Sequence, residues 1–428
     1  MEQSIDHLSD KQRKQFEAIA SLVVQTDRAS IRQGVELASA LGDQAVFAAL
    51  VSGVEQQSQP PSAAKKRPQN RRFQTLHGGQ IFEDLNVGQA WVGLVMAHLL
   101  AASELPQRGE VTSLALGAPK LPRRSVPLLW IDGLERLTSL THLDLYLSAD
   151  DEGVDLRGLQ RFPSLTHLRM FGPGLPRPLP ALENLESLDA LRFELEPDAV
   201  FPALRSIRGR SLTHESLRPA RFPNLVDIEA KGGMKIEGFS SLGKVMCQGD
   251  IELHGCERID RLQVIRGSFN GPDLRHVGEL VGVGPGFDVS QLETLGAIQF
   301  SRTTKFVGGT FPPGTRLLHP KISFWGPTLT DLGNVGELPG LETLHLVRVK
   351  APISLDTLRH ARSLRVLDIR NSPGITDLSP LIGLPKLETI IMREIDELDI
   401  PAELADKVEK VGPRSAVRAK RRAAKGKA

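Results

Sequence analysis

A short leucine motif recurs along most of this chain and limits its fold more than any other feature. Residues 137–145 follow the spacing L-x-x-L-x-x-L-x-L, and residues 162–170, 338–346 and 384–392 repeat it with related apolar side chains. One such strand is too short to bury its own apolar residues, so that each copy has to stack on the next. The pattern therefore predicts an α/β solenoid of parallel strands with one continuous core.

The expected coils extend from about residue 111 to residue 400. We place the start of a coil at the first apolar residue of each predicted strand, which gives about 14 coils with a mean spacing of about 21 residues. These starts are Leu114, Leu143, Leu168, Leu191, Ile207, Ile228, Ile251, Phe269, Leu280, Ile298, Ile322, Leu344, Leu367 and Ile390.

In this repetition the chain resembles bacterial leucine-rich-repeat proteins of the type with about 22 residues per coil. Between residues 245 and 300 the spacing shortens and glycines precede the strands, which is similar to the coils of receptor L-domains. The resemblance implies a β-solenoid with a concave parallel sheet on one side. Because the pattern is irregular in this central stretch, its coil boundaries stay open.

The rest of the chain divides by composition. The pairs Ser9/Gln12 and Ser30/Gln33 have the spacing of helix-capping boxes, and Gly42-Asp43 is typical of one helix ending and another beginning. Residues 59–72 are polar, basic and proline-bearing, as in a linker. We expect a helical N-terminal domain over 1–57, a linker over 58–75, a helical cap over 76–110, the solenoid over 111–400, and a basic disordered tail over 401–428.

The tail holds an unusual share of the positive charge. The chain has a net charge of +2, yet residues 414–428 contain seven basic residues and no acidic one. Its densest part consists of Arg418, Lys420, Arg421 and Arg422. Such a tail predicts either weak contact with nucleic acid or ribosomes, which would fall with salt, or a solvated end that aids solubility.

The concave sheet is the predicted binding surface, because strand residues that alternate with the leucines project from it and stacking aligns them between coils. A mixture of charges and aromatics is typical of protein-binding surfaces, although such residues can also simply solvate a sheet. The candidates are Asp144, Tyr146, Arg169, Phe171, Arg192, Glu194, Glu229, Lys231, Trp325, His345, Asp368, Arg370 and Arg393.

The residues offer little for catalysis. Cys247 and Cys256 form no C-x-x-C pair, so that Cys256 is expected to bond backbone in its turn and Cys247 to lie in the core. His142 and His167 with Asp144 could supply three metal ligands, but polar residues are common at such strand positions. Bacterial effectors with such repeats that ligate ubiquitin carry a catalytic domain after the repeats, and only about 28 residues follow here. We predict no enzyme activity, no metal and no cofactor.

The sequence therefore favours a non-enzymatic protein–protein recognition module whose partner it does not name. The first residues lack the basic start and apolar core of a secretory signal, and the most apolar run, residues 90–102, is too short to cross a bilayer. We expect a cytoplasmic protein without membrane contact, and the oligomeric state stays open. Two alternatives remain: a secreted effector that binds a host protein, and a nucleic-acid-associated or ribosome-associated protein that uses its tail.

Overall fold

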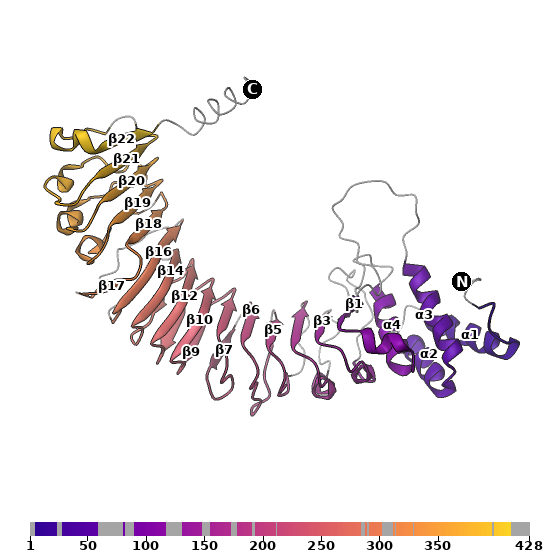
Figure 1. Cartoon of the computed structure of the whole chain (residues 1–428). Coiled ribbons are helices and arrows are strands. Elements are labelled where there is room, and N and C mark those ends of the chain that lie inside the picture. The colour runs from indigo at the N-terminus through magenta and orange to yellow at the C-terminus, as the bar shows by residue number, and fades with distance from the viewer. Residues whose placement is uncertain are drawn as a thin grey trace, which may run out of the picture. The chain divides into compact units, whose positions relative to one another are not determined.

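The chain is described by a computed structural model (Figure 1). The described residues are 5–23, 28–58, 80–81, 90–116, 131–147, 155–172, 178–190, 193–210, 212–283, 287–288, 291–301, 311–312, 314–327, 329–395 and 398–411. The predicted linker lies mostly outside this range, and so does the basic end of the chain with Arg418, Lys420, Arg421 and Arg422. No helix among the described residues is long and apolar enough to span a membrane.

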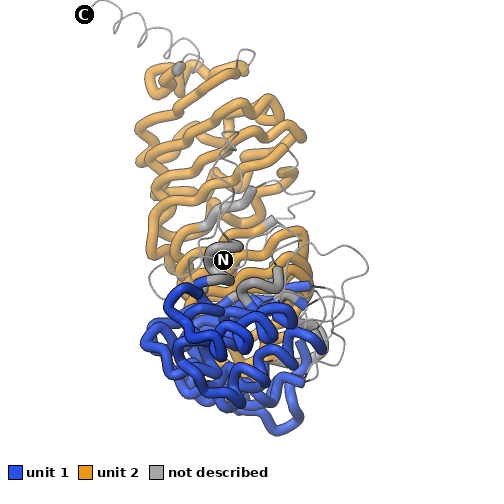
Figure 2. The backbone as a smooth tube through the Cα atoms, turned by 90° about the vertical axis from the view of Figure 1, so that its right-hand side faces the viewer, with its two compact units in different colours: residues 1–209, 220–224 blue, residues 210–219, 225–428 orange. Residues whose placement is uncertain are grey.

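The chain forms two compact units, shown in different colours in Figure 2. The first consists of residues 1–209 and 220–224, and the second of residues 210–219 and 225–428. Each unit has its own set of parallel strands.

Four helices begin the first unit: α1 (Asp10–Val23), α2 (Arg28–Leu41), α3 (Gln44–Ser58) and α4 (Ala90–Ala102). The expected capping box at Ser9 is confirmed, because its backbone N–H donates to Oε1 of Gln12 (3.0 Å) and its Oγ accepts from the N–H of Gln12 (3.4 Å). Asp43 caps α3 by accepting from the N–H of Ala45. The predicted box at Ser30 is wrong, since α2 already begins at Arg28.

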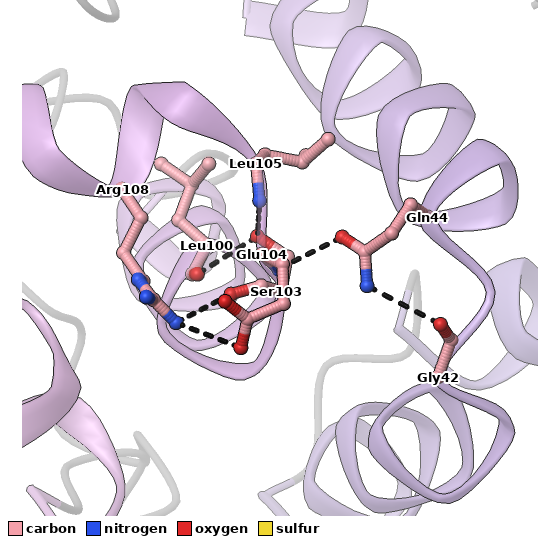
Figure 3. A network of polar contacts seen from close by, with 7 residues as sticks. All are labelled: Gly42, Gln44, Leu100, Ser103, Glu104, Leu105 and Arg108. Atoms are coloured by element: carbon pink, nitrogen blue, oxygen red, sulfur yellow. Dashed lines mark hydrogen bonds and ion pairs between the residues drawn. The ribbon is translucent and has the colours of Figure 1, made fainter.

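A polar network ties the start of α3 to the end of α4 (Figure 3). Oε1 of Gln44 accepts from the N–H of Glu104 (2.8 Å), and its amide donates to the carbonyl of Gly42 (3.2 Å). Arg108 then donates to the carbonyl of Ser103 (2.9 Å). This network and the apolar surface of α4, with Val95 and Leu99 fully buried, fix the helices as a cap on the first strands.

Parallel strands follow in the first unit. They are β1 (Gln80–Ile81), β2 (Ser113–Leu116), β3 (His142–Tyr146), β4 (His167–Phe171), β5 (Ser187–Ala190) and β6 (Ser206–Gly209). Each pairs in parallel with the next in this order. The 3-10 turns η2 (Pro106–Glu110), η3 (Leu134–Arg136) and η5 (Arg157–Arg161) lie between helix and strand or between strands.

The second unit has a long parallel sheet, here called its main sheet. Its strands are β8 (Asp227–Ala230), β10 (Ser241–Cys247), β12 (Arg258–Ile265), β14 (His276–Val283), β16 (Thr294–Ser301), β18 (Lys321–Trp325), β19 (Thr343–Val347), β20 (Val366–Arg370), β21 (Thr389–Arg393) and β22 (Val408–Val411), paired in this order. The two-residue strand β17 (Arg316–Leu317) pairs with β16.

A second sheet accompanies the central coils. It consists of β7 (Leu212–Leu217), β9 (Met234–Glu237), β11 (Ile251–His254), β13 (Phe269–Asn270) and β15 (Phe287–Asp288), which pair in parallel. In the C-terminal coils the place of this sheet is taken by the 3-10 turns η6 (Val335–Glu337), η7 (Asp356–His360), η8 (Ser379–Leu381) and η9 (Ala402–Lys407). Figure 1 shows these turns on the side of the coils away from β19–β22.

The protein is thus a parallel β-solenoid with a few helices, of about 11 turns at a spacing of about 19 residues. The expected number of fourteen coils is wrong. One reason is that a central coil has a strand in each sheet: Ile251 and Phe269, taken as separate coil starts, belong to β11 and β13 of the second sheet. The main-sheet strands β10 and β12 were missed in their place.

Two further expectations need correction. The coil start at Leu191 is wrong, because Leu188 of β5 pairs with Leu168 of β4 and takes that position. The array also extends beyond residue 400, since η9 is followed by β22, in which Val408 pairs with Ile390. The predicted tail from residue 401 is therefore structured up to residue 411.

Candidate functional site

The open face of the solenoid is formed by the main-strand residues whose neighbours along the strand are buried. In β18, for example, Ile322 and Phe324 are buried while Lys321, Ser323 and Trp325 point the other way. The parallel register then aligns outward residues in rows that cross the strands, and one row joins Trp325, Val347, Arg370 and Arg393. This is the face that the sequence predicts for binding.

In the first unit the open face carries a charge ladder. Asp144, Arg169, Asp189 and Arg208 stand in register on four successive strands. Arg169 forms ion pairs with Asp144 (3.4 Å) and Asp189 (3.7 Å), and Arg208 pairs with Asp189 (3.6 Å). Burial raises the pKa of the Asp144 carboxyl, against the lowering effect of Arg169. The charges of this ladder cancel within the face itself.

Two aromatic contacts border the ladder. The guanidinium of Arg169 lies 4.9 Å from the ring centroid of Phe171, a cation–π distance. Tyr146 is in register with Phe171, but its side chain lies outside the described part of the structure. The rings of His142 and His167 stack with centroids 4.1 Å apart.

The His142–His167 stack is the metal site considered from the sequence. Nδ1 of each ring is within hydrogen-bond distance of the neighbouring threonine hydroxyl, Thr141 or Thr166. Burial and then the charge of His167 lower the pKa of His142. Within the described residues, no group of three or more His, Cys, Asp or Glu side chains is placed to hold a metal ion.

Four candidates lie near strand ends, with different outcomes. Glu194 follows β5 and is not on it, and its carbonyl accepts from the N–H of Leu179 (2.6 Å). Its predicted place on the open face is therefore wrong, for the same three-residue shift that misplaced the coil start. Arg192 lies outside the described residues. Glu229 does point outward from β8, whereas Lys231 is exposed just after that strand ends.

The C-terminal coils place a second set of candidates together. Asp368 on β20 is 1% exposed, and both of its carboxylate oxygens accept from Nε of Arg370, at 2.8 and 2.9 Å. Nδ1 of His345 lies 3.7 Å from Oδ2 of the same carboxylate. Burial lowers the pKa of His345, with Lys321 and Arg370 acting in the same direction and Asp368 opposing them. Hydrogen bonding to Asp368 raises the pKa of Arg370.

Trp325 and Arg393 stand at the two ends of one row. Trp325 is 43% exposed, next to the buried Val347. Arg393 is half-buried, and its Nε is a buried donor with no hydrogen-bond partner among the described residues. Sequence reasoning missed Lys321, which projects from the same strand and the same face as Trp325. The signal was present, since the two residues are four apart in a strand with a period of two.

The cysteines are not placed for nucleophilic chemistry. Both are buried, and burial raises the pKa of Cys247 to about 12 and that of Cys256 to about 11. Sγ of Cys247 contacts the carbonyl of Gly232 (3.0 Å), and Sγ of Cys256 contacts that of Arg258 (3.8 Å). The expectation that they are buried and bonded to backbone is confirmed. A thiol with so high a pKa is almost wholly protonated near neutral pH and is a poor nucleophile.

No protein-family model matches this chain, and no curated protein is similar enough to it to count as a relative.

Proposed function

We propose that this protein is a bacterial leucine-rich-repeat solenoid whose open face recognises another protein and performs no chemistry on it. One observation supports this most strongly. Trp325, a large apolar side chain 43% exposed to solvent, projects from a regular sheet among arginine side chains. Tryptophan and arginine are the residues that most often dominate protein–protein binding energy, and a side chain on a rigid strand loses little freedom when it binds.

The experiment compares partner capture by three full-length proteins: wild type, Trp325→Ala and Ile382→Ala. Ile382 is the matched control because it is 42% exposed, in the same unit, but follows η8 and not a main-sheet strand. We expect a discrete protein to be captured from the native lysate by wild type and Ile382→Ala, and to be lost or reduced about tenfold or more with Trp325→Ala.

Equal capture by all three proteins would contradict the proposal, and so would loss with Ile382→Ala alone. Far-ultraviolet circular dichroism of each variant establishes that the comparison is made between folded proteins. Contact with nucleic acid through the tail rests on residues outside the described range and stays a separate prediction.

A further inference from the structure

The open face of β18–β21 has more positive than negative side chains. Its outward residues are Lys321, Ser323, Trp325, Thr343, His345, Val347, Val366, Asp368, Arg370, Thr389, Ile391 and Arg393, and all of them are described. Three are permanent cations, and Asp368 is the one carboxylate among them. Because Asp368 is buried and held by Arg370, it does not compensate Lys321 or Arg393.

Other stretches of open face balance their charges. In the first unit Arg169 bridges Asp144 and Asp189. In the central coils Arg261 pairs with Glu279 at 3.3 Å, and Lys244 is in register with Asp227. The surplus on β18–β21 is therefore a local feature of the described sheet and not the general state of this face.

Arg393 gives an independent indication that an acceptor is missing there. Its Nε is buried and donates to no atom of the described structure. A buried donor without an acceptor generally costs about 1–3 kcal/mol, which is why most such groups in native proteins are paired. A carboxylate from outside the chain that draws the guanidinium toward it would remove this cost, since arginine binds carboxylates through two parallel N–H donors.

The row geometry suggests how such a partner would lie. Trp325 on β18 and Arg393 on β21 are separated by three strand spacings, or about 14 Å. That distance is spanned by about four residues of extended chain. An apolar side chain of a peptide could then pack on Trp325 while an acidic side chain of the same peptide reaches Arg393.

We propose that the patch Lys321–Trp325–Arg370–Arg393 binds an acidic peptide segment of a partner protein, with an apolar side chain on Trp325 and carboxylates at Arg393 and Lys321. This inference rests on the proposed function and names the chemistry of the partner. Nucleic acid fits less well, because tight binding to it requires many phosphate contacts. Here three cations are interrupted by Asp368 and bordered by the exposed carboxylates Glu394 and Glu409.

A library of random linear peptides displayed on phage, selected on the immobilised full chain, tests the proposal while the partner protein is still unidentified. We expect the enriched peptides to combine aspartate or glutamate with an aromatic or large aliphatic residue within a few positions. Synthetic versions should bind wild type, lose about tenfold or more in affinity with Arg393→Gln or Trp325→Ala, and weaken as salt is raised.

Arg359→Gln is the control for charge, because Arg359 lies in η7 and pairs with Asp356 (3.3 Å) away from the open face. Its affinity for the peptides should equal that of wild type. Enrichment of peptides without acidic residues, an absence of enrichment, or equal binding by Arg393→Gln would overturn the acidic-peptide inference. A partner protein whose capture depends on Trp325 but not on Arg393 would do the same while leaving the proposed function intact. Single-stranded RNA that displaces the peptides from the patch would also overturn it.

Discussion

The central and C-terminal coils of the second unit solve the same packing problem with different repeat lengths. In the central coils Arg258 pairs with His276 and His276 with Thr294, each 18 residues later. In the C-terminal coils Thr343 pairs with Val366 and Val366 with Thr389, each 23 residues later. The shorter coil returns through a two-residue to four-residue strand of the second sheet, whereas the longer one has room for a 3-10 turn.

The difference in length also changes how closely the backbones approach. A Cβ added to Gly296 in the central coils would lie 1.7 Å from the carbonyl oxygen of Gly278, and one added to Gly278 would lie 2.5 Å from that of Asp260. The C-terminal coils fill their interior with a buried serine instead. Oγ of Ser372 donates to the carbonyls of Leu346 (3.1 Å) and Arg370 (2.9 Å) and accepts from the N–H of Val349 (3.0 Å). Short coils therefore depend on absent side chains, and long coils depend on polar ones.

The largest expected effect comes from adding a side chain to a central coil. Gly296→Ala places a methyl group against backbone, which has nowhere to move, so we expect the free energy of unfolding to fall by about 3 kcal/mol or more. Urea unfolding followed by circular dichroism measures it.

Gly340→Ala is the matched variant in the C-terminal coils. Gly340 has open space around it and a φ of 85°, so that only backbone strain applies, at about 1–2 kcal/mol. Gly109→Ala, with neither a close neighbour nor a positive φ, should leave stability unchanged. Equal losses for Gly296→Ala and Gly340→Ala would show that close approach does not distinguish the two regions.

Removing the serine hydroxyl tests the long coils. Ser372→Ala leaves the buried N–H of Val349 without an acceptor, and we expect a loss of about 1–3 kcal/mol in the same assay. Ser354→Ala, which removes an exposed hydroxyl bonded to Asp356, should change stability by less than about 0.5 kcal/mol. A neutral Ser372→Ala would mean that the hydroxyl does not hold adjacent coils together.

The alkaline stability of the central coils should depend on their two thiols. Burial raises the pKa of Cys247 from 9.0 to about 12 and that of Cys256 from 9.0 to about 11. The unfolded chain therefore releases these protons first, so stability is complete below pH 9 and is lost as the pH rises toward 11–12. Urea midpoints across this range should fall less steeply for Cys247→Ala/Cys256→Ala than for wild type. Parallel slopes would contradict the assignment.

The smallest effect is expected at the balanced charges of the central open face. Arg261 and Glu279 are both partly exposed, and exposed ion pairs contribute about 0–1 kcal/mol. Arg261→Gln should therefore shift stability by less than about 0.5 kcal/mol and should not alter binding of the enriched peptides. Loss of peptide binding with Arg261→Gln would move the recognition surface from β18–β21 toward the central coils.

The sequence predicted the solenoid where the leucine pattern was unambiguous and failed where two registers fit it. At β5, Leu185, Leu188 and Leu191 follow one another at three-residue spacing, so the motif could begin at either of the last two. In the central coils, apolar residues alternate in both sheets, and Ile251 of the second sheet resembles a main-strand start as closely as Val245 does. Pattern alone does not separate two strands of one coil from one strand each of two coils.

The candidate site shows the same limit. Alternation with buried residues correctly placed Arg169, Trp325 and Arg393 on outward positions of the strands. It treated Asp368 as an exposed binding residue, although Arg370 and His345 cover it. That outcome depends on side chains from a neighbouring strand 23 residues away, a pairing that the spacing of the leucines implies but the identity of a single residue does not.

The most direct test of recognition through the open face is site-specific photo-crosslinking. A benzophenone amino acid is incorporated at position 325 in one protein and at position 382 in another, and each full chain is irradiated in native lysate. We expect a discrete protein adduct from position 325, absent from position 382 and suppressed by an excess of the enriched acidic peptide. An adduct from position 382 alone, or none from position 325, would contradict recognition through this face.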